Sequence, residues 1–184
     1  MKKKIINDER QRVLNQLKDS REIIDLTTTG SSMEPLIQSN STVYIEFNHI
    51  KNISIGDVIA FYDQYGVSVH RCIRKKNENI LERGDGCNLW AKCNWVTSND
   101  IIGKVIYVEY ENKRLVIESF GYKVYSFFIV VIGKLSNRVG SINKIDTSKK
   151  PHISLKDQGS SVSKVINRFI LLLHRIFVKY EKTE

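Results

Sequence analysis

The stretch Gly30-Ser31-Ser32-Met33-Glu34-Pro35 offers a serine hydroxyl in a turn of small residues. A serine becomes a useful nucleophile when a neighbouring base accepts its proton and backbone N–H groups face the developing oxyanion. A Gly-Ser-Ser turn before a Met-x-Pro segment could expose such a hydroxyl beside a free backbone amide. Turns rich in serine are common, however, so this stretch alone does not separate a catalytic serine from a structural one.

The candidate base lies in a second motif, Val69-His70-Arg71, within a segment rich in β-branched residues. Histidine suits the task because its reference pKa of about 6.5 leaves a substantial neutral fraction near pH 7. A lone histidine in a strand is usually structural. The motifs that surround His70 therefore decide how it is interpreted.

Five short motifs follow one another along the chain. They are the G-x-S-M-x-P box at 30–35, Gly56-Asp57-Val58-Ile59, His70-Arg71, Gly84-Asp85 and Ile101-Ile102-Gly103-Lys104-Val105. Their order and spacing resemble the signal peptidase and LexA-type repressor superfamily of serine peptidases, over about residues 28–108. The resemblance implies that Ser32 is the nucleophile and His70 its general base. Bacterial type I enzymes and LexA-like proteins have a lysine as base, so histidine here resembles the archaeal and endoplasmic-reticulum branch.

Asp85 is the expected third member of the site. Its carboxylate, in a turn after Gly84, could accept the Nδ1–H of His70 and fix the tautomer of the imidazole. The endoplasmic-reticulum enzymes that the chain resembles usually use an aspartate a few residues further on, and residues 86–92 contain no acid. Two hypotheses stay open: Asp85 orients His70, which we expect, or the site is a Ser/His dyad and Asp85 stabilises a turn.

The neighbours of Ser32 have expected roles in the same site. The resemblance implies that Met33 helps to wall the substrate pocket. Pro35, whose ring fixes its φ angle, limits the backbone after the nucleophile. The backbone N–H of Ser32 would bind the oxyanion, with the Ser31 hydroxyl as a weaker second donor.

The cysteines do not suggest a cofactor. Cys72, Cys87 and Cys93 are odd in number and contain no close pair, which fits neither a disulfide framework nor a zinc site. We expect buried or idle thiols, no metal and no cofactor.

The segments that must position these residues have the pattern of short β-strands. Six runs rich in Val, Ile, Tyr and Phe are separated by turn residues, at 41–47, 57–62, 67–73, 78–83, 101–110 and 114–119. No helical pattern lies between them. We therefore expect a mainly β catalytic domain over residues 27–120, a signal-peptidase- or LexA-like sheet sandwich or partly open barrel.

Helical and apolar segments flank this domain. The expected parts are an N-terminal amphipathic helix at 1–26, an apolar segment at 121–136, a linker or loop at 137–163 and a basic amphipathic C-terminal helix at 164–184. The last helix suits either a membrane interface or packing against the apolar segment. The N-terminal residues lack a continuous apolar core, so we expect neither a signal peptide nor an N-terminal membrane anchor.

The charge balance favours acidic partners. Lys plus Arg total 29 against 20 Asp plus Glu, a net charge of +9, which suits an anionic membrane surface, an acidic peptide or nucleic acid. A helix-turn-helix needs two packed helices, and residues 5–25 supply only one. We therefore expect no nucleic-acid partner.

Together these features predict a serine endopeptidase that removes a leader or signal segment from a peptide or protein precursor through an acyl-enzyme on Ser32. We expect it in the cytoplasm or peripherally on the cytoplasmic face of the membrane, which its C-terminal region could contact. Two alternatives are an atypical signal peptidase anchored in the membrane through its C-terminal region and a non-catalytic module that binds peptides on a peptidase fold.

Overall fold

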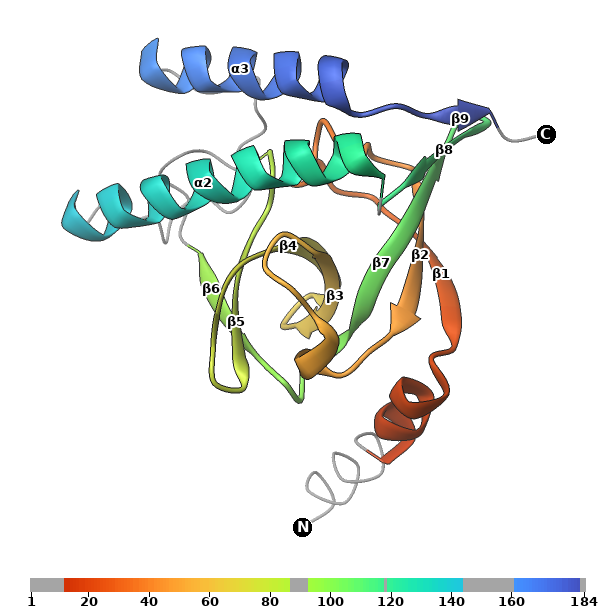
Figure 1. Ribbon diagram of the computed structural model, residues 1–184. Helices are drawn as coiled ribbons and strands as arrows, with labels where there is room; N and C mark the ends of the chain where they lie inside the picture. The colour runs from red at the N-terminus through yellow and green to blue at the C-terminus, as the bar shows by residue number, and fades with distance from the viewer. Residues whose placement is uncertain (1–11, 87–92, 118, 144–160, 183–184) are drawn as a thin grey trace.

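A computed structural model describes residues 12–86, 93–117, 119–143 and 161–182. Over these ranges the protein is mainly β: an antiparallel sheet, curled into a half-barrel, is flanked by an N-terminal helix and by two C-terminal helices (Figure 1). The predicted fold class is thereby confirmed. Within the described ranges, no helix is both long enough and apolar enough to cross a membrane.

Nine strands make up the sheet in the described part of the chain. They are β1 (Ile23–Thr27), β2 (Thr42–Phe47), β3 (Val58–Asp63), β4 (Gly66–Lys76), β5 (Asn79–Arg83), β6 (Asn94–Thr97), β7 (Ile101–Tyr110), β8 (Lys113–Val116) and β9 (Glu181–Lys182). Their order is β1-β2-β7-β3-β4-β5-β6, and β8 joins β7 to β9. The six predicted strands correspond to β2, β3, β4, β5, β7 and β8, whereas β1, β6 and β9 were not predicted.

The strands follow the two-residue alternation of a half-buried sheet. In β2, for example, Val43, Ile45 and Phe47 are buried and the residues between them are only half-buried. The ladders β2–β7, β3–β7 and β4–β5 each contain an irregularity in register. Such bulges bend a strand and increase its twist, so they account for the curled shape of the sheet.

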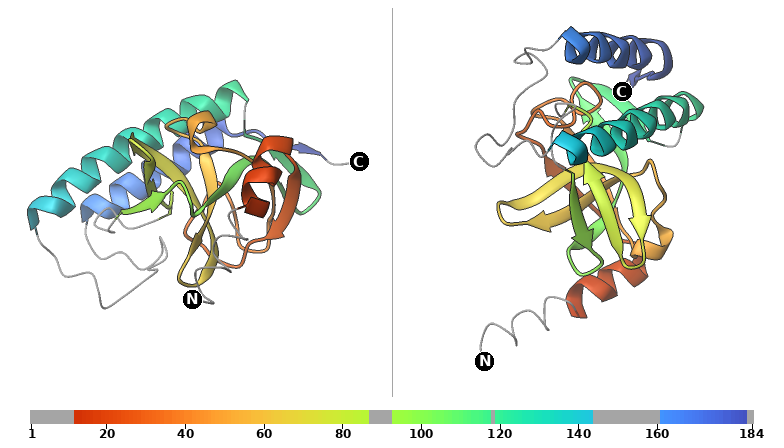
Figure 2. Two further views of the ribbon diagram at one scale, coloured as in Figure 1. Left: turned by 90° about the horizontal axis from the view of Figure 1, so that it is seen from below. Right: turned by 90° about the vertical axis from the view of Figure 1, so that its left-hand side faces the viewer.

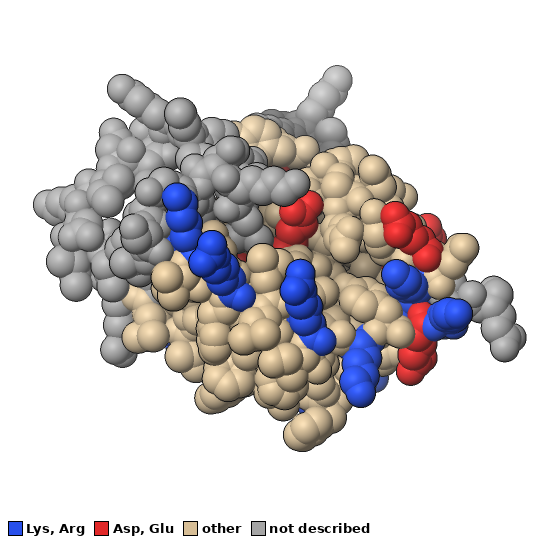
Figure 3. Space-filling model, turned by 90° about the horizontal axis from the view of Figure 1, so that it is seen from above, with Lys and Arg blue, Asp and Glu red and all other residues tan. Residues whose placement is uncertain are grey.

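Two antiparallel helices cover one side of the sheet (Figures 1 and 2). Helix α2 (Phe120–Asn143) lies across the strands, and α3 (Ser161–Phe177) lies on the outside of α2. The main core gathers side chains from sheet and helices, among them Val43, Ile45, Val58, Tyr125, Ile129, Ile170 and Leu173. Seen from the α3 side, Lys and Arg side chains form a row across the surface (Figure 3).

The C-terminal boundaries differ from those predicted. Helix α2 continues past the predicted apolar segment into the predicted linker, and α3 begins inside that linker, at Ser161. Residues 144–160, the middle of the predicted linker, lie outside the described ranges. The predicted C-terminal helix ends early because Glu181–Lys182 pairs with β8 as strand β9.

The N-terminal helix is also shorter than predicted. It ends at residue 20, and Arg21 takes a positive φ of 52°, a conformation that breaks a helix. The residues that follow pair with β2 as strand β1, so tertiary pairing overrides the helical pattern there. The helix packs on the domain through Leu14, and Asp19 contacts His49 at 2.8 Å.

A fully buried arginine connects these elements. Arg71 on β4 donates from Nε and Nη2 to the two carboxylate oxygens of Asp85, at 2.7 and 2.5 Å. Its Nη1 donates to the carbonyl of Gly56 and to the hydroxyls of Tyr122 and Ser126, at 2.7 to 2.8 Å. The guanidinium therefore ties β4, the segment after β5, the turn before β3 and helix α2 into one unit.

The charge of Arg71 is maintained by its partner. Burial acts to lower the pKa of the guanidinium, but the Asp85 carboxylate raises it, and the net pKa lies above the ordinary value for arginine. Removing one member of a buried ion pair leaves the other charge uncompensated, which is costly.

We predict that Asp85→Asn lowers the free energy of unfolding by about 3–5 kcal/mol, because it leaves the buried Arg71 cation without a counter-charge. Chemical denaturation, with the slope compared to the parent, measures the loss. Asp25→Asn, the same substitution at an exposed strand position, is the matched control and should change stability by less than about 0.5 kcal/mol. Equal stability of Asp85→Asn and the parent would contradict the central role of the pair.

Candidate functional site

The structure brings Ser32 and His70 into hydrogen-bond contact. Ser32 Oγ lies 3.0 Å from His70 Nε2, although the residues are 38 positions apart in the chain. Ser32 sits in a turn whose carbonyls are held by backbone N–H groups: Glu34 donates to Ser31 at 3.1 Å, and Gly86 donates to Ser32 at 2.8 Å. These backbone hydrogen bonds therefore fix the turn that presents the Ser32 hydroxyl to His70.

The other nitrogen of His70 meets a carboxylate, that of Glu82. The distance from His70 Nδ1 to Glu82 Oε2 is 2.5 Å, and the exposed fractions of the two side chains are 14% and 5%. The second carboxylate oxygen, Oε1, accepts a hydrogen bond from the Asn94 side-chain amide at 3.0 Å. Each of the two carboxylate oxygens of Glu82 therefore has a hydrogen-bond partner.

These contacts define the tautomer of the imidazole. A carboxylate can only accept, so His70 Nδ1 donates to Glu82. In the neutral ring Nε2 then has a free lone pair and accepts the hydroxyl proton of Ser32. The line Ser32–His70–Glu82 has the connectivity of a catalytic triad, in which the acid orients the base and stabilises its cationic form.

Asp85 does not occupy the position predicted for it. Both of its carboxylate oxygens bind the guanidinium of Arg71, and Glu82 instead contacts His70. The expected Asp85–His70 contact is therefore wrong for this structure. Asp85 serves the stability of the fold beside the site.

A bulge in β4 explains the exchange of carboxylates. Next to the hairpin turn, β4 pairs with β5 in the register Lys76–Asn79, Lys75–Ile80 and Arg74–Leu81. If this register continued along β4, His70 would lie opposite Asp85. One extra residue in β4, Ile73, interrupts the ladder, so the pairs farther from the hairpin turn, Cys72–Glu82 and Arg71–Arg83, are shifted by one position. Because side chains alternate between faces, the shift turns Asp85 away and makes Glu82 a diagonal neighbour of His70 on the same face.

Glu82 was not singled out from the sequence because it lies inside a predicted strand. The signal that could have found it is its place in the hairpin, since Glu82 and His70 share a face only when β4 carries a bulge. Bulge positions are weakly encoded in residue type. Asn94, which donates to Glu82, was missed because strand β6, which carries it, was not predicted.

The predicted neighbours of Ser32 lie close to it in different settings. Met33 is 4% exposed and belongs to the main core, so it anchors the turn and offers little surface to a substrate, in contrast to the predicted pocket wall. Ser31 and Pro35 are half-buried, and the Glu34–Pro35 peptide bond is cis. The oxyanion roles of the Ser32 amide and Ser31 hydroxyl stay predictions.

The backbone of Gly86 lies in close contact with the Ser32 turn. A Cβ added at this position would lie 2.7 Å from the Glu34 carbonyl oxygen and 2.9 Å from that of Ser31. Both neighbours are backbone atoms, which cannot move aside without moving the turn. A glycine is therefore required here for the close approach that the Gly86 N–H bond to Ser32 depends on.

The described cysteines are not candidate nucleophiles. Cys72 and Cys93 are buried free thiols, as expected, and Cys87 lies outside the described ranges. Burial raises the pKa of Cys72 to about 12 and also raises that of Cys93. Neither forms a reactive thiolate near neutral pH.

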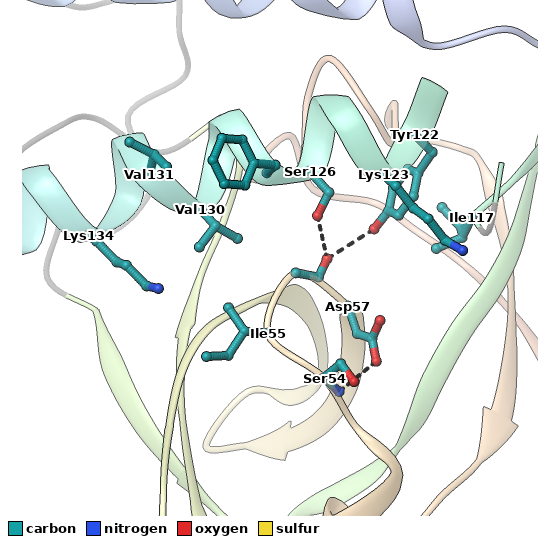
Figure 4. Close-up of a pocket in the computed structure, with 12 residues that line it drawn as sticks. Ser54, Ile55, Asp57, Ile117, Tyr122, Lys123, Ser126, Val130, Val131 and Lys134 are labelled. Atoms are coloured by element: carbon teal, nitrogen blue, oxygen red, sulfur yellow. Dashed lines mark hydrogen bonds between the residues drawn. The ribbon is translucent and has the colours of Figure 1, made fainter. Parts of the chain in front are cut away.

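A surface pocket lies apart from these residues. It has a volume of about 460 Å³ and is formed between α2 and the turn that leads into β3 (Figure 4). Ile55, Phe127 and Val131 supply apolar lining, whereas Lys123 and Lys134 add positive charge. Ser32, His70 and Glu82 do not line it, so this pocket is not the setting of the triad.

Comparison with known protein families and with curated proteins finds no match for this chain. The site is therefore defined by its geometry. Its connected hydroxyl, imidazole and carboxylate are the groups that acyl transfer requires, and the described residues contain no cluster suited to a metal ion.

We predict that Gly86→Ala displaces the Ser32 turn and lengthens the contact between Ser32 Oγ and His70 Nε2 beyond hydrogen-bond reach. The added methyl group meets two carbonyl oxygens well inside normal contact distance. A crystal structure of the variant measures the displacement. Gly30→Ala is the matched control, because a Cβ there meets no atom within 4 Å, and an unmoved turn in Gly86→Ala would refute the prediction.

Proposed function

We propose that the protein is a serine endopeptidase that cleaves a leader or signal segment from a peptide or protein precursor. The observation that carries the proposal is the line from Ser32 Oγ to His70 Nε2, at 3.0 Å, and from His70 Nδ1 to Glu82, at 2.5 Å. The order of the sequence motifs, which resembles signal peptidases of the Ser/His branch, supports the choice of substrate class.

In the proposed reaction, the three side chains act together in two stages, formation of an acyl-enzyme and its hydrolysis. His70 Nε2 takes the proton of Ser32 as its Oγ attacks the scissile carbonyl, and Glu82 stabilises the imidazolium. The Ser32 amide donates to the oxyanion. The imidazolium then protonates the leaving amine, the acyl-enzyme forms, and a water activated by His70 releases the acyl group.

An extended peptide could reach this site by adding to a strand edge. Strand β1 lies at one end of the sheet order and leads within five residues to Ser32. Backbone pairing with such an edge supplies binding energy without a deep pocket. This suits a precursor whose leader is unstructured around the cleavage point.

We predict that Ser32→Ala and His70→Ala each abolish endopeptidase activity while leaving the fold intact. The assay follows cleavage of a peptide library by mass spectrometry, together with labelling of Ser32 by a fluorophosphonate probe. Ser39→Ala and His49→Ala are the matched controls, since neither side chain touches the triad. Full cleavage by Ser32→Ala would refute the proposal, and a folded parent that neither cleaves nor reacts with the probe would indicate a peptide-binding module.

We predict that Glu82→Gln lowers kcat by about 10³–10⁴-fold, because a neutral amide cannot stabilise the imidazolium and can favour the wrong tautomer. The loss should fall on kcat more than on KM, as expected for a residue that acts through His70. Thermal unfolding should stay close to that of the parent. Retention of parental kcat by Glu82→Gln would remove Glu82 from the mechanism.

A further inference from the structure

The outer face of α3 carries a continuous apolar stripe. Val165, Phe169, Leu172 and Ile176 follow one another at intervals of four, three and four residues, which places them on one side of a helix. Their exposed fractions are 65%, 43%, 52% and 53%. The stripe is therefore an apolar surface that the described part of the fold leaves open to solvent.

This stripe is distinct from the face by which α3 packs on the protein. Ile170 and Leu173 are buried in the main core, and Ile166 and Phe177 pack against it. At 100° per residue, this packed face and the exposed stripe lie on different sides of the helix. Phe169, at the edge of the stripe next to the packed face, also meets the Phe128 ring of α2 edge-on, with the ring centroids 6.2 Å apart. The more exposed Val165, Leu172 and Ile176 make up the part of the stripe that is open to solvent.

Basic residues run along the stripe. Lys164, Arg168 and Arg175 are exposed, and at 100° per residue they lie next to the stripe around the helix. Lys and Arg side chains form a row on the side of the molecule that α3 covers (Figure 3). The segments 120–143 and 161–180 contain no Asp or Glu. This face therefore combines apolar side chains with a row of positive charge that α2 and α3 themselves do not offset, although acidic side chains from other segments also lie on this side of the molecule (Figure 3).

We propose that the outer face of α3 docks the protein on an anionic lipid surface. Apolar side chains beside a basic row match the interface of such a bilayer, where the former enter the acyl boundary and the latter meet lipid phosphates. A second copy of the chain fits less well, because joining two such faces would bring basic rows together with no acid on α2 or α3 to pair with them.

Docking of α3 would place the Ser32 turn near the lipid. Tyr180, just beyond α3, donates its hydroxyl proton to the carbonyl of Leu36 at 3.2 Å, and Leu36 shares the main core with Ile170 and Leu173. The segment that follows the Ser32 turn therefore packs against α3 and the residues just beyond it. The docking itself does not depend on the proposed peptidase activity.

The test is flotation of the full-length protein with phosphatidylcholine vesicles, with and without phosphatidylglycerol. We expect binding only to the anionic vesicles, and loss of that binding in Leu172→Gln/Ile176→Gln. Arg168→Glu/Arg175→Glu should weaken it by at least about 25-fold, at about fivefold per basic residue.

The matched control is Lys51→Glu/Lys76→Glu, which makes the same change in net charge on exposed residues outside α2 and α3, one between β2 and β3 and one at the end of β4. It should keep binding within about threefold, because charges beyond a Debye length are screened. Circular dichroism and thermal unfolding establish that each variant is folded. Absence of binding to anionic vesicles, or equal weakening by the control, would overturn the proposal. A concentration-dependent dimer abolished by Leu172→Gln/Ile176→Gln, without vesicle binding, would overturn it in favour of a second copy.

Discussion

The buried Arg71–Asp85 pair is the constraint on which the rest of the structure depends. A guanidinium without access to water needs a partner for its charge and acceptors for its remaining N–H groups. Those partners come from the segment after β5, from the Gly56 carbonyl and from α2. Each segment is thereby fixed relative to β4. Gly86 follows Asp85 directly and binds the Ser32 carbonyl, so the position of the proposed nucleophile is also set by this pair.

Successive side chains of β4 point to opposite faces of the sheet, and this places His70 and Arg71 in different surroundings. His70 faces Glu82 and the hydroxyl of Ser32, whereas the next residue, Arg71, faces the opposite side and helix α2. A histidine followed by an arginine thus places an imidazole, the proposed base, on one face of β4 and a structural cation on the other. Helix α2, which covers Arg71, packs beside α3, whose exposed side carries apolar and basic side chains. The two helices that pack on the site thus also carry the proposed lipid-binding surface.

Much of this arrangement was predictable from local sequence. Alternating β-branched residues located six strands, and the order of the motifs paired Ser32 with His70. Strand β1 was missed because its pairing with β2 overrides a helical pattern, and β9 because two residues carry no pattern of their own. The identity of the acid depends on strand register, which is a property of two strands together. Residue types around His70 therefore could not distinguish Glu82 from Asp85.

The bulge at Ile73 has a consequence for how such a site can change. The choice between the two carboxylates is encoded in the length of β4, not in the chemistry of any side chain. A substitution at Ile73 alters packing but keeps the residue count, so both acids stay on their present faces. Removal of a single residue there would instead shift the register of the part of β4 that carries His70 and Arg71, so that each side chain would face the opposite set of side chains of β5. A substitution at the buried Ile73 is thus expected to cost stability, whereas a deletion there would exchange the acid that faces His70.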